Sequence, residues 1–253
     1  MPFRISQPSF QSLYMEMLAN GHTIACGTAF VANSSSGSSF LLTNRHNVTG
    51  RHQDTGELLC KRSGAIPDTL AVWHNSYEYL GHFVRVDMPL FDGGTPQWIE
   101  HPVLQENADI VAFPLATCQN IALYPYQTEY YAHMHVEPAQ AVSVVGFPFG
   151  LRTGSSFAVW ATGFVASEPE IDHGGRRVFL IDCRTRTGQS GSPVIRYQNG
   201  GGLITHENGP EVISPVCRLL GMYSGRINDD SDLGVVWKTS VIAELLDCAS
   251  SPY

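Results

Sequence analysis

The sequence has 253 residues, with 15 basic and 23 acidic side chains and a formal net charge of −8 at pH 7. A chain of this length can bury a core without disulfides or metal ions. Its negative charge disfavours binding to nucleic-acid phosphates and to acidic membrane surfaces. No apolar stretch approaches the roughly 18 residues that a membrane-spanning helix needs. We therefore expect a globular protein with neither a nucleic-acid nor a membrane partner.

Short apolar segments rich in β-branched and aromatic residues recur along the chain, separated by clusters of Gly, Pro, Asn and Asp. Asn20-Gly21 lies between two of these segments, and this dipeptide is the strongest short-range signal of a β-hairpin. We predict a hairpin over residues 12–19 and 22–32. Further strands are predicted at residues 40–43, 70–74, 83–86, 110–113, 141–145, 157–165, 178–181, 194–197, 216–223 and 234–237.

The C-terminal segment has a different, helical spacing of apolar residues. Ser240 can cap a helix in which Val241, Ile242, Leu245 and Leu246 share one face. Residues 50–64 and 87–105 are expected as longer surface insertions. The expected fold class is therefore all-β with one closing α-helix.

Three residues carry the chemistry that nucleophilic acyl transfer requires. His46, Asp109 and Ser190 each adjoin one of the predicted strands. A serine hydroxyl is a weak nucleophile until an imidazole accepts its proton and a carboxylate orients that imidazole. The sequence therefore predicts a catalytic triad of these three residues. Asp87 and Asp92 lie in the same interval as Asp109 and are alternative partners of the histidine.

At these residues the sequence resembles the trypsin-like (chymotrypsin-fold) serine peptidases, above all the branch that includes HtrA-type proteases and bacterial glutamyl endopeptidases. Residues 188–193 have the family's Gly-x-Ser-Gly-x-Pro form, and residues 43–46 match its Thr-x-x-His pattern. The turn at residues 146–150 is similar to a Gly-x-Pro-x-Gly turn of HtrA-type proteases. The resemblance extends from about residue 25 to residue 246, and no PDZ-like extension follows it.

The resemblance and the strand count together imply two six-stranded antiparallel β-barrels, the first over residues 1–115 and the second over residues 116–253. The chain would form a single peptidase unit with its site between the barrels. The family's oxyanion hole corresponds here to Gly188, Gln189 and Ser190, with the amides of Gly188 and Ser190 facing the substrate.

The resemblance places substrate-binding residues on two segments, at Arg184 and Thr185 and at Tyr223, Ser224, Gly225 and Arg226. A guanidinium beside the site would suit an acidic substrate side chain. The alternative is that Arg184, Arg186 and Arg226 face solvent or pair with Asp172, Asp182 or Asp229.

Gln189 stands where relatives that are activated by cleavage carry an aspartate. That aspartate binds a newly formed N-terminal amine, and the family's Ile-Val-Gly-Gly activation sequence is also missing. We therefore predict that no zymogen cleavage is needed and that the oxyanion loop is held by its own hydrogen bonds.

The six cysteines do not follow the disulfide pattern of secreted animal relatives, because Asn47 occupies the position after the histidine where those relatives have Cys. We expect reduced thiols, the alternative being three disulfides. Gln7, Ser9 and Gln11 interrupt the apolar stretch that a signal peptide needs. Both observations favour a cytoplasmic protein.

The resemblance implies a serine endopeptidase that cleaves proteins or peptides through an acyl-enzyme intermediate, without a metal ion or other cofactor. The alternative is a latent or non-catalytic module of the same fold that binds peptides or a partner protein, because a fold does not guarantee its activity. An α/β-hydrolase esterase is disfavoured, since its nucleophile lies in a Gly-x-Ser-x-Gly elbow and residue 192 is serine.

Overall fold

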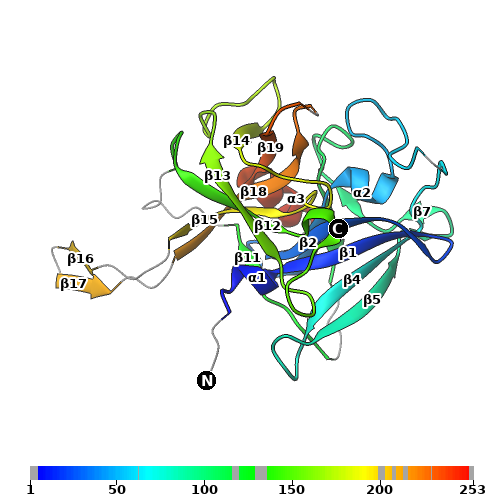
Figure 1. The fold of residues 1–253 in the computed structure, drawn as a ribbon, viewed down its shortest axis with the longest axis horizontal. Helices are drawn as coiled ribbons and strands as arrows, with labels where there is room; N and C mark the ends of the chain where they lie inside the picture. Colours follow the sequence, from blue (N-terminus) through cyan, green and yellow to red (C-terminus); the bar gives the residue numbers. More distant parts are fainter. Residues whose placement is uncertain are drawn as a thin grey trace.

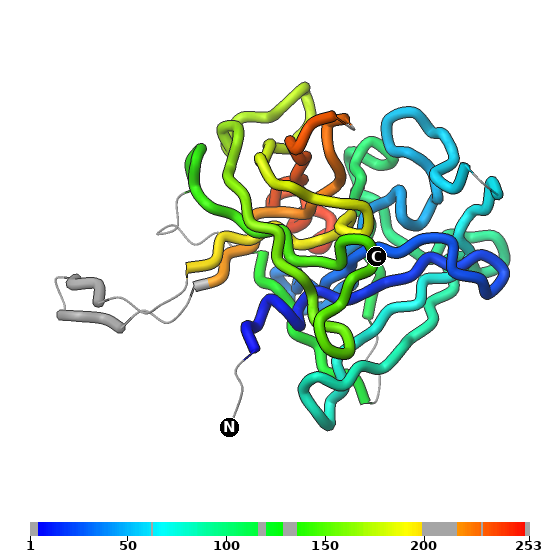
Figure 2. The backbone as a smooth tube through the Cα atoms, in the orientation of Figure 1, coloured from blue at the N-terminus to red at the C-terminus, as the bar shows by residue number. Residues whose placement is uncertain are grey.

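The computed structural model describes residues 5–61, 63–115, 120–128, 136–198, 203–206, 209–212, 216–228 and 230–250. The chain forms two β-rich halves that lie side by side (Figures 1 and 2). None of the helices in the described residues is long and apolar enough to cross a membrane.

Among its described residues, the first half contains two short helices and eleven strands. In chain order they are α1 (Pro8–Gln11), β1 (Ser12–Ala19), β2 (His22–Asn33), β3 (Ser39–Thr43), α2 (Arg45–Thr49), β4 (Thr69–Ser76), β5 (Phe83–Pro89), β6 (Phe91–Asp92), β7 (Thr95–Pro96), β8 (Ile99–Glu100), β9 (Val111–Pro114), β10 (Ile121–Ala122) and β11 (Tyr126–Gln127).

The β1–β2 hairpin is confirmed, with Ala19 paired to His22 across the Asn20-Gly21 turn. Both turn residues have positive φ, 51° at Asn20 and 77° at Gly21, as the tight hairpin turn requires. The hairpin joins a sheet whose strands run β10-β4-β1-β2-β3-β9-β8, with β5 paired to β4 and β11 paired to β2.

In the part of the chain that the structure describes, the first half does not close into the barrel expected over residues 1–115. The six strands β5-β4-β1-β2-β3-β9 are paired in the antiparallel order of such a barrel, but the sheet stays open. β5 is only partly buried and carries the exposed pair Arg85 and Asp87. A half-exposed strand with charged side chains is typical of a sheet edge.

In the part of the second half that the structure describes there are eight strands, one 3₁₀ turn and the last helix. They are β12 (Ala141–Gly146), η1 (Pro148–Gly150), β13 (Val159–Val165), β14 (Val178–Asp182), β15 (Pro193–Gln198), β16 (Leu203–His206), β17 (Gly209–Val212), β18 (Val216–Arg226), β19 (Leu233–Lys238) and α3 (Thr239–Ser250). Six of these strands close into a barrel in the order β12-β13-β14-β19-β18-β15, which confirms one of the two expected six-stranded antiparallel barrels.

Strand β1 explains how the halves attach, because it is buried on both faces. Leu13 and Met15 point into the core of the first half. Tyr14, on the opposite face, belongs to a second core together with Phe147 and Trp237 of the second half. Alternate residues of one strand thus bury apolar area in two cores, so that the halves share a hydrophobic contact.

Helix α3 begins at Thr239, one residue before the expected cap, and buries the four apolar residues predicted for its inner face. It contacts β18 and β19 of the barrel as well as β8 and β9 of the first half. Its Glu244 accepts two hydrogen bonds from Arg177 of the barrel and lies 3.5 Å from His101 of the first half. The helix therefore ties the two halves together.

Candidate active site

His46 and Asp109 are paired at the edge of the first half. The His46 Nδ1 atom lies 2.7 Å from Asp109 Oδ2, and the His46 backbone N–H donates to Asp109 Oδ1 over 2.9 Å. His46 sits in the short helix α2, whose preceding residue Asn44 donates from Nδ2 to the Asp109 carbonyl. Asp109 is only 1% exposed, so it is a buried carboxylate whose partners hold both its oxygens.

The two aspartates named as alternative partners, Asp87 and Asp92, do not bind the histidine. Asp87 pairs with Arg85 on β5, and Asp92 lies exposed on the β6–β7 hairpin. A third partner of Asp109 is instead Ser224 of β18, whose Oγ donates to Oδ2 at 2.5 Å. This bond joins the acidic residue of the first half to the barrel.

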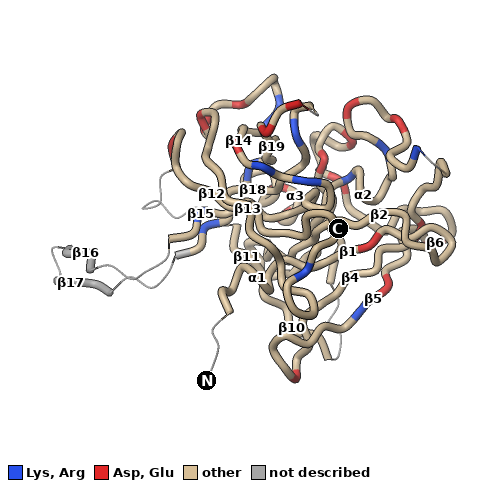
Figure 3. Tube along the Cα trace, viewed as in Figure 1, with Lys and Arg blue, Asp and Glu red and all other residues tan. Residues whose placement is uncertain are grey.

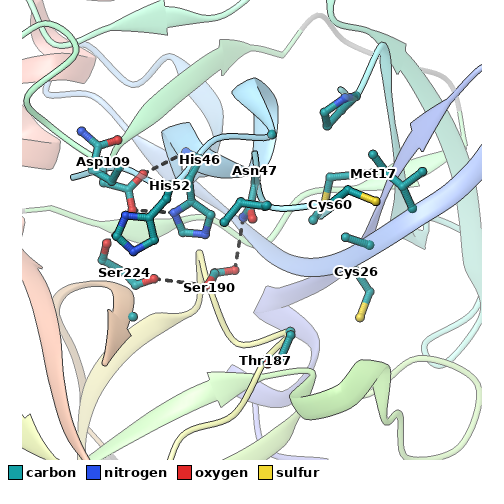
Figure 4. A pocket seen from close by; sticks show the side chains of 18 of the residues that line it. Met17, Cys26, His46, Asn47, His52, Cys60, Asp109, Thr187, Ser190 and Ser224 are labelled. Atoms are coloured by element: carbon teal, nitrogen blue, oxygen red, sulfur yellow. Dashed lines mark hydrogen bonds and ion pairs between the residues drawn. The ribbon is translucent and has the colours of Figure 1, made fainter. Parts of the chain in front are cut away.

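Ser190 reaches the same point from the barrel. Figure 4 shows the His46 ring between Asp109 and Ser190. The Ser190 hydroxyl donates to the Ser224 carbonyl over 3.2 Å. The Ser190 carbonyl accepts from the Thr28 backbone N–H at 3.0 Å and from Asn47 Nδ2 at 3.4 Å. The serine is thus held at the junction by backbone contacts from both halves.

The loop before Ser190 is held as predicted by its own hydrogen bonds. Gln189 is fully buried, and its Oε1 accepts the Arg186 backbone N–H over 2.8 Å, while its own N–H donates to the Arg186 carbonyl. Thr28 adds a bond from the other half, since its Oγ1 donates to the Gly188 carbonyl at 2.9 Å. The loop therefore has supports that involve no charged N-terminal amine.

Gly188 adopts φ of 95°, and a side chain there would collide with the Phe147 carbonyl oxygen. Only glycine fits this position without strain. The N–H groups of Gly188 and Ser190 donate to no other residue within the described part of the chain. Two neighbouring backbone donors beside a serine can bind an anionic oxygen.

These residues line a cavity of about 460 Å³ that extends along the junction. Four of the predicted substrate-binding residues, those at the end of β18, line it: Tyr223, Ser224, Gly225 and Arg226. The other two do not. Arg184 is exposed and lies 3.6 Å from Asp232, while Thr185 is buried and hydrogen bonds to the Tyr223 hydroxyl.

Arg186 lines the cavity and also approaches Asp232, at 3.4 Å. The partner of Arg184 and Arg186 is therefore Asp232, and neither of the two pairs with Asp172 or Asp182. Asp229 lies outside the described residues. Figure 3 marks the arginines of the segment before β15 and at the end of β18 in blue.

Sequence reasoning missed a third part of the site. The segment after α2, expected as a plain surface insertion, contributes His52, Asp54 and Leu59 to the cavity wall. Asp54 also pairs with Arg176 of the barrel at 2.8 Å. One signal could have indicated this role: the segment follows His46 directly, so its ends must lie near the histidine.

The described thiols of the site and the barrel form no disulfides, and their burial ranges from partial at Cys26 to complete at Cys183. No disulfide joins the five cysteines that the structure describes, and Cys118 lies outside the described residues. Burial raises the pKa of the Cys26 thiol, which lines the cavity, and raises the pKa of Cys183 to about 11. Burial likewise raises the pKa of Tyr223 to about 12. These groups stay neutral near pH 7 and supply no charge to the site.

Comparison with known proteins adds a family and a fold. The family described as "Trypsin-like peptidase domain" matches residues 27–201. No curated protein sequence matches the chain.

Solved structures resemble it over nearly its whole length. The active form of the Rv3671c protease from M. tuberculosis is 17% identical, with a TM-score of 0.51 over 97% of this chain and 83% of that one. A serine endoprotease from Yersinia pestis is 12% identical, with a TM-score of 0.54 over 98% of this chain and 67% of that one.

Proposed function

Because the chain belongs to the trypsin-like peptidase family, we propose that it is a serine endopeptidase whose nucleophile is Ser190. The observation that carries this proposal is the pairing of a buried Asp109 with His46 at 2.7 Å, directly beside Ser190. The N–H of Ser190 and that of Gly188 donate to no other residue in the described part of the chain. Within the family we propose that the chain is nearest to the HtrA-type and glutamyl endopeptidase branch, on the basis of the Gly-x-Pro-x-Gly turn at residues 146–150.

In the proposed reaction, His46 Nε2 removes the proton from the Ser190 hydroxyl, and Oγ bonds to the carbonyl carbon of the peptide. Asp109 holds Nδ1 as the donor nitrogen and stabilises the positive imidazolium that forms. Ser190 must first turn from the Ser224 carbonyl toward His46, and such rotamer changes take picoseconds to nanoseconds. The histidine can then act as the base.

The oxygen of the attacked carbonyl becomes negative and lies against the Gly188 and Ser190 amides. Each such donor lowers the barrier by about 3 kcal/mol. His46 next gives its proton to the leaving nitrogen, the C–N bond breaks, and an acyl-Ser190 ester remains. Water, deprotonated by His46, hydrolyses this ester and restores the serine.

The hydrogen bonds of Gln189 support a site that needs no activating cleavage. The side chain that would receive a new N-terminal amine is here an uncharged amide that binds the Arg186 backbone. The loop is already in the conformation that presents both amides. We therefore expect activity in the chain without prior processing.

A fluorophosphonate probe tests this function directly. Wild-type protein should be labelled and should hydrolyse casein, whereas Ser190→Ala should do neither. Ser192→Ala is the matched control, because Ser192 is a buried serine two residues away whose hydroxyl hydrogen bonds to none of the proposed reacting atoms. Casein hydrolysis by Ser190→Ala at the wild-type rate would contradict the assignment.

A further inference from the structure

The two sides of Ser190 differ sharply within the cavity. On one side lies the end of β18, and on the other lies a surface that we call the apolar wall. It is formed by β1, β2 and the segment after α2, through Met17, Ile24, Cys26, Leu59, Ala65 and Pro67. Figure 4 shows Met17 and Cys26 on the opposite side of Ser190 from Ser224.

On the β18 side, the Tyr223 side chain fills the space between β18 and the segment around Thr185 that precedes Ser190. Its ring packs on Gly234, where an added Cβ would lie only 2.7 Å from Tyr223 Cε2. Its hydroxyl bonds to Thr185 Oγ1, and the side chain is 3% exposed. A substrate side chain entering here meets the tyrosine instead of an open pocket.

The apolar wall is formed before any substrate arrives. The Leu59 N–H donates to the Gly50 carbonyl at the end of α2, and the His52 N–H donates to the Glu57 carbonyl. Pro67 packs against Gly50, where an added Cβ would lie 2.6 Å from Pro67 Cδ. A preformed apolar surface binds an apolar side chain without the cost of ordering a loop.

The proposed reaction determines which half of the substrate contacts the apolar wall. His46 protonates the leaving nitrogen, so the leaving half of the peptide passes on the side of α2. The apolar wall includes the segment that follows α2 directly. The acyl half, which stays bonded to Ser190, lies toward the Ser224 carbonyl.

We propose that this site selects substrates mainly on the leaving side of the scissile bond, where the apolar wall takes a large apolar residue, and admits only small residues on the acyl side. This inference rests on the proposed serine endopeptidase activity. The preferred substrate is a peptide with a small residue before the cut and Leu or Phe within the first two residues after it.

A randomised peptide library with mass spectrometry of the products tests both sides at once. We expect Leu or Phe to exceed Ala on the leaving side by at least about tenfold in kcat/KM, since one methylene in an apolar pocket already gives about that factor. On the acyl side, Gly, Ala and Ser should exceed Phe. Indifference on the leaving side with a strong acyl-side preference for large residues would overturn the inference.

Two substitutions in the same segment give a matched pair. Leu59 lines the cavity and is 45% exposed, while Ile66 is 42% exposed and does not line it. Leu59→Asp should reduce the leaving-side preference about tenfold and leave the acyl-side preference unchanged, whereas Ile66→Asp should keep both. Equal preferences in the two variants would argue against the wall.

Tyr223→Ala supplies an independent test on the other side. It should add cleavage after Phe and Leu, a gain that a merely destabilised protein would not show. Rates are normalised to the fraction labelled by the fluorophosphonate probe. If wild-type protein is neither labelled nor active on any peptide, the proposed function itself fails, whereas labelling and cleavage without leaving-side selection defeat this inference alone.

Discussion

The two halves of the molecule position their parts of the candidate site in different ways. The barrel closes on itself and presents Ser190 on a loop whose backbone groups are held by hydrogen bonds with Gln189 and Thr28, with Gly188 at positive φ. The first half is an open sheet that presents His46 through side-chain bonds to a buried carboxylate. Backbone geometry therefore sets the chemistry of the barrel side, and side-chain pairing sets that of the sheet side.

The largest expected effect comes from a substitution in the first half, at the buried carboxylate that pairs with His46. Asp109→Asn keeps the shape of the side chain but turns its amide toward His46 and favours the wrong imidazole tautomer. We expect kcat to fall by about 10⁴-fold, with little change in thermal stability. Steady-state kinetics on a peptide substrate measure this loss.

Asp87→Asn is the control, because Asp87 forms an exposed pair with Arg85 away from the site. It should keep kcat within about twofold, as expected for an exposed ion pair. A similar loss in both variants would show that Asp109 has no special role.

The next largest effect comes from a substitution in the barrel half that alters only the backbone of the loop before Ser190. In Gly188→Ala the new Cβ collides with the Phe147 carbonyl, so the loop must shift and the Gly188 amide turns away. We expect kcat to fall by about 10²- to 10³-fold, the usual cost of one oxyanion donor. Fluorophosphonate labelling should slow in parallel.

Gly174→Ala is the matched control, because Gly174 also has positive φ, 61°, but nothing lies near its added Cβ. Its backbone strain should lower stability by about 1 kcal/mol and leave kcat unchanged. If Gly174→Ala lost as much activity as Gly188→Ala, strain rather than amide placement would be the cause.

A third effect is a pH dependence of stability that arises from a buried histidine in the first half. His74 of β4 is buried in the first half, and desolvation lowers its pKa to about 4 from an ordinary value of 6.5. Between these values the unfolded chain binds more protons than the folded one, so stability falls as the pH drops from about 6.5 to about 4. The full loss amounts to about 3 kcal/mol.

Urea unfolding at pH 7 and at pH 4.5 measures this loss. In His74→Gln the difference between the two pH values should shrink, while in His22→Gln, at the exposed first residue of β2, it should match wild type. An unchanged pH dependence in His74→Gln would mean that other groups cause the acid instability.

The longer strands and the closing helix could be predicted from sequence because each depends on local pattern, whereas the triad of His46, Asp109 and Ser190 stays a prediction from its motifs. The Asn20-Gly21 turn requires positive φ, and the residues around Ser190 form a specific motif. The open edge at β5 could not be predicted, since nothing in its alternating pattern says whether a further strand pairs with it.

The apolar wall and the burial of Thr185 could not be predicted from the sequence either, because both depend on contacts between distant segments. Thr185 is adjacent to a site segment, yet its hydroxyl turns inward to Tyr223. Leu59 lies in a turn-rich insertion that resembles a surface loop until the end of α2 folds it back over the cavity. The residues next to a position in the sequence indicate whether it lies near the site, whereas the direction of its side chain depends on how distant segments pack.

The smallest expected effect concerns the helix that joins the halves. Glu244 of α3 accepts from both Arg177 nitrogens at 2.6 Å, and this pairing lowers the pKa of Glu244. Glu244→Gln should lower the free energy of unfolding by about 1 kcal/mol or less, because the side chain is 48% exposed and water screens the ion pair. A loss of this size lowers Tm by about 2–4 °C. Glu57→Gln removes the more exposed pair with Lys61 and should shift Tm by less. Scanning calorimetry measures both, and equal shifts would show that Glu244 adds nothing to the junction of the two halves.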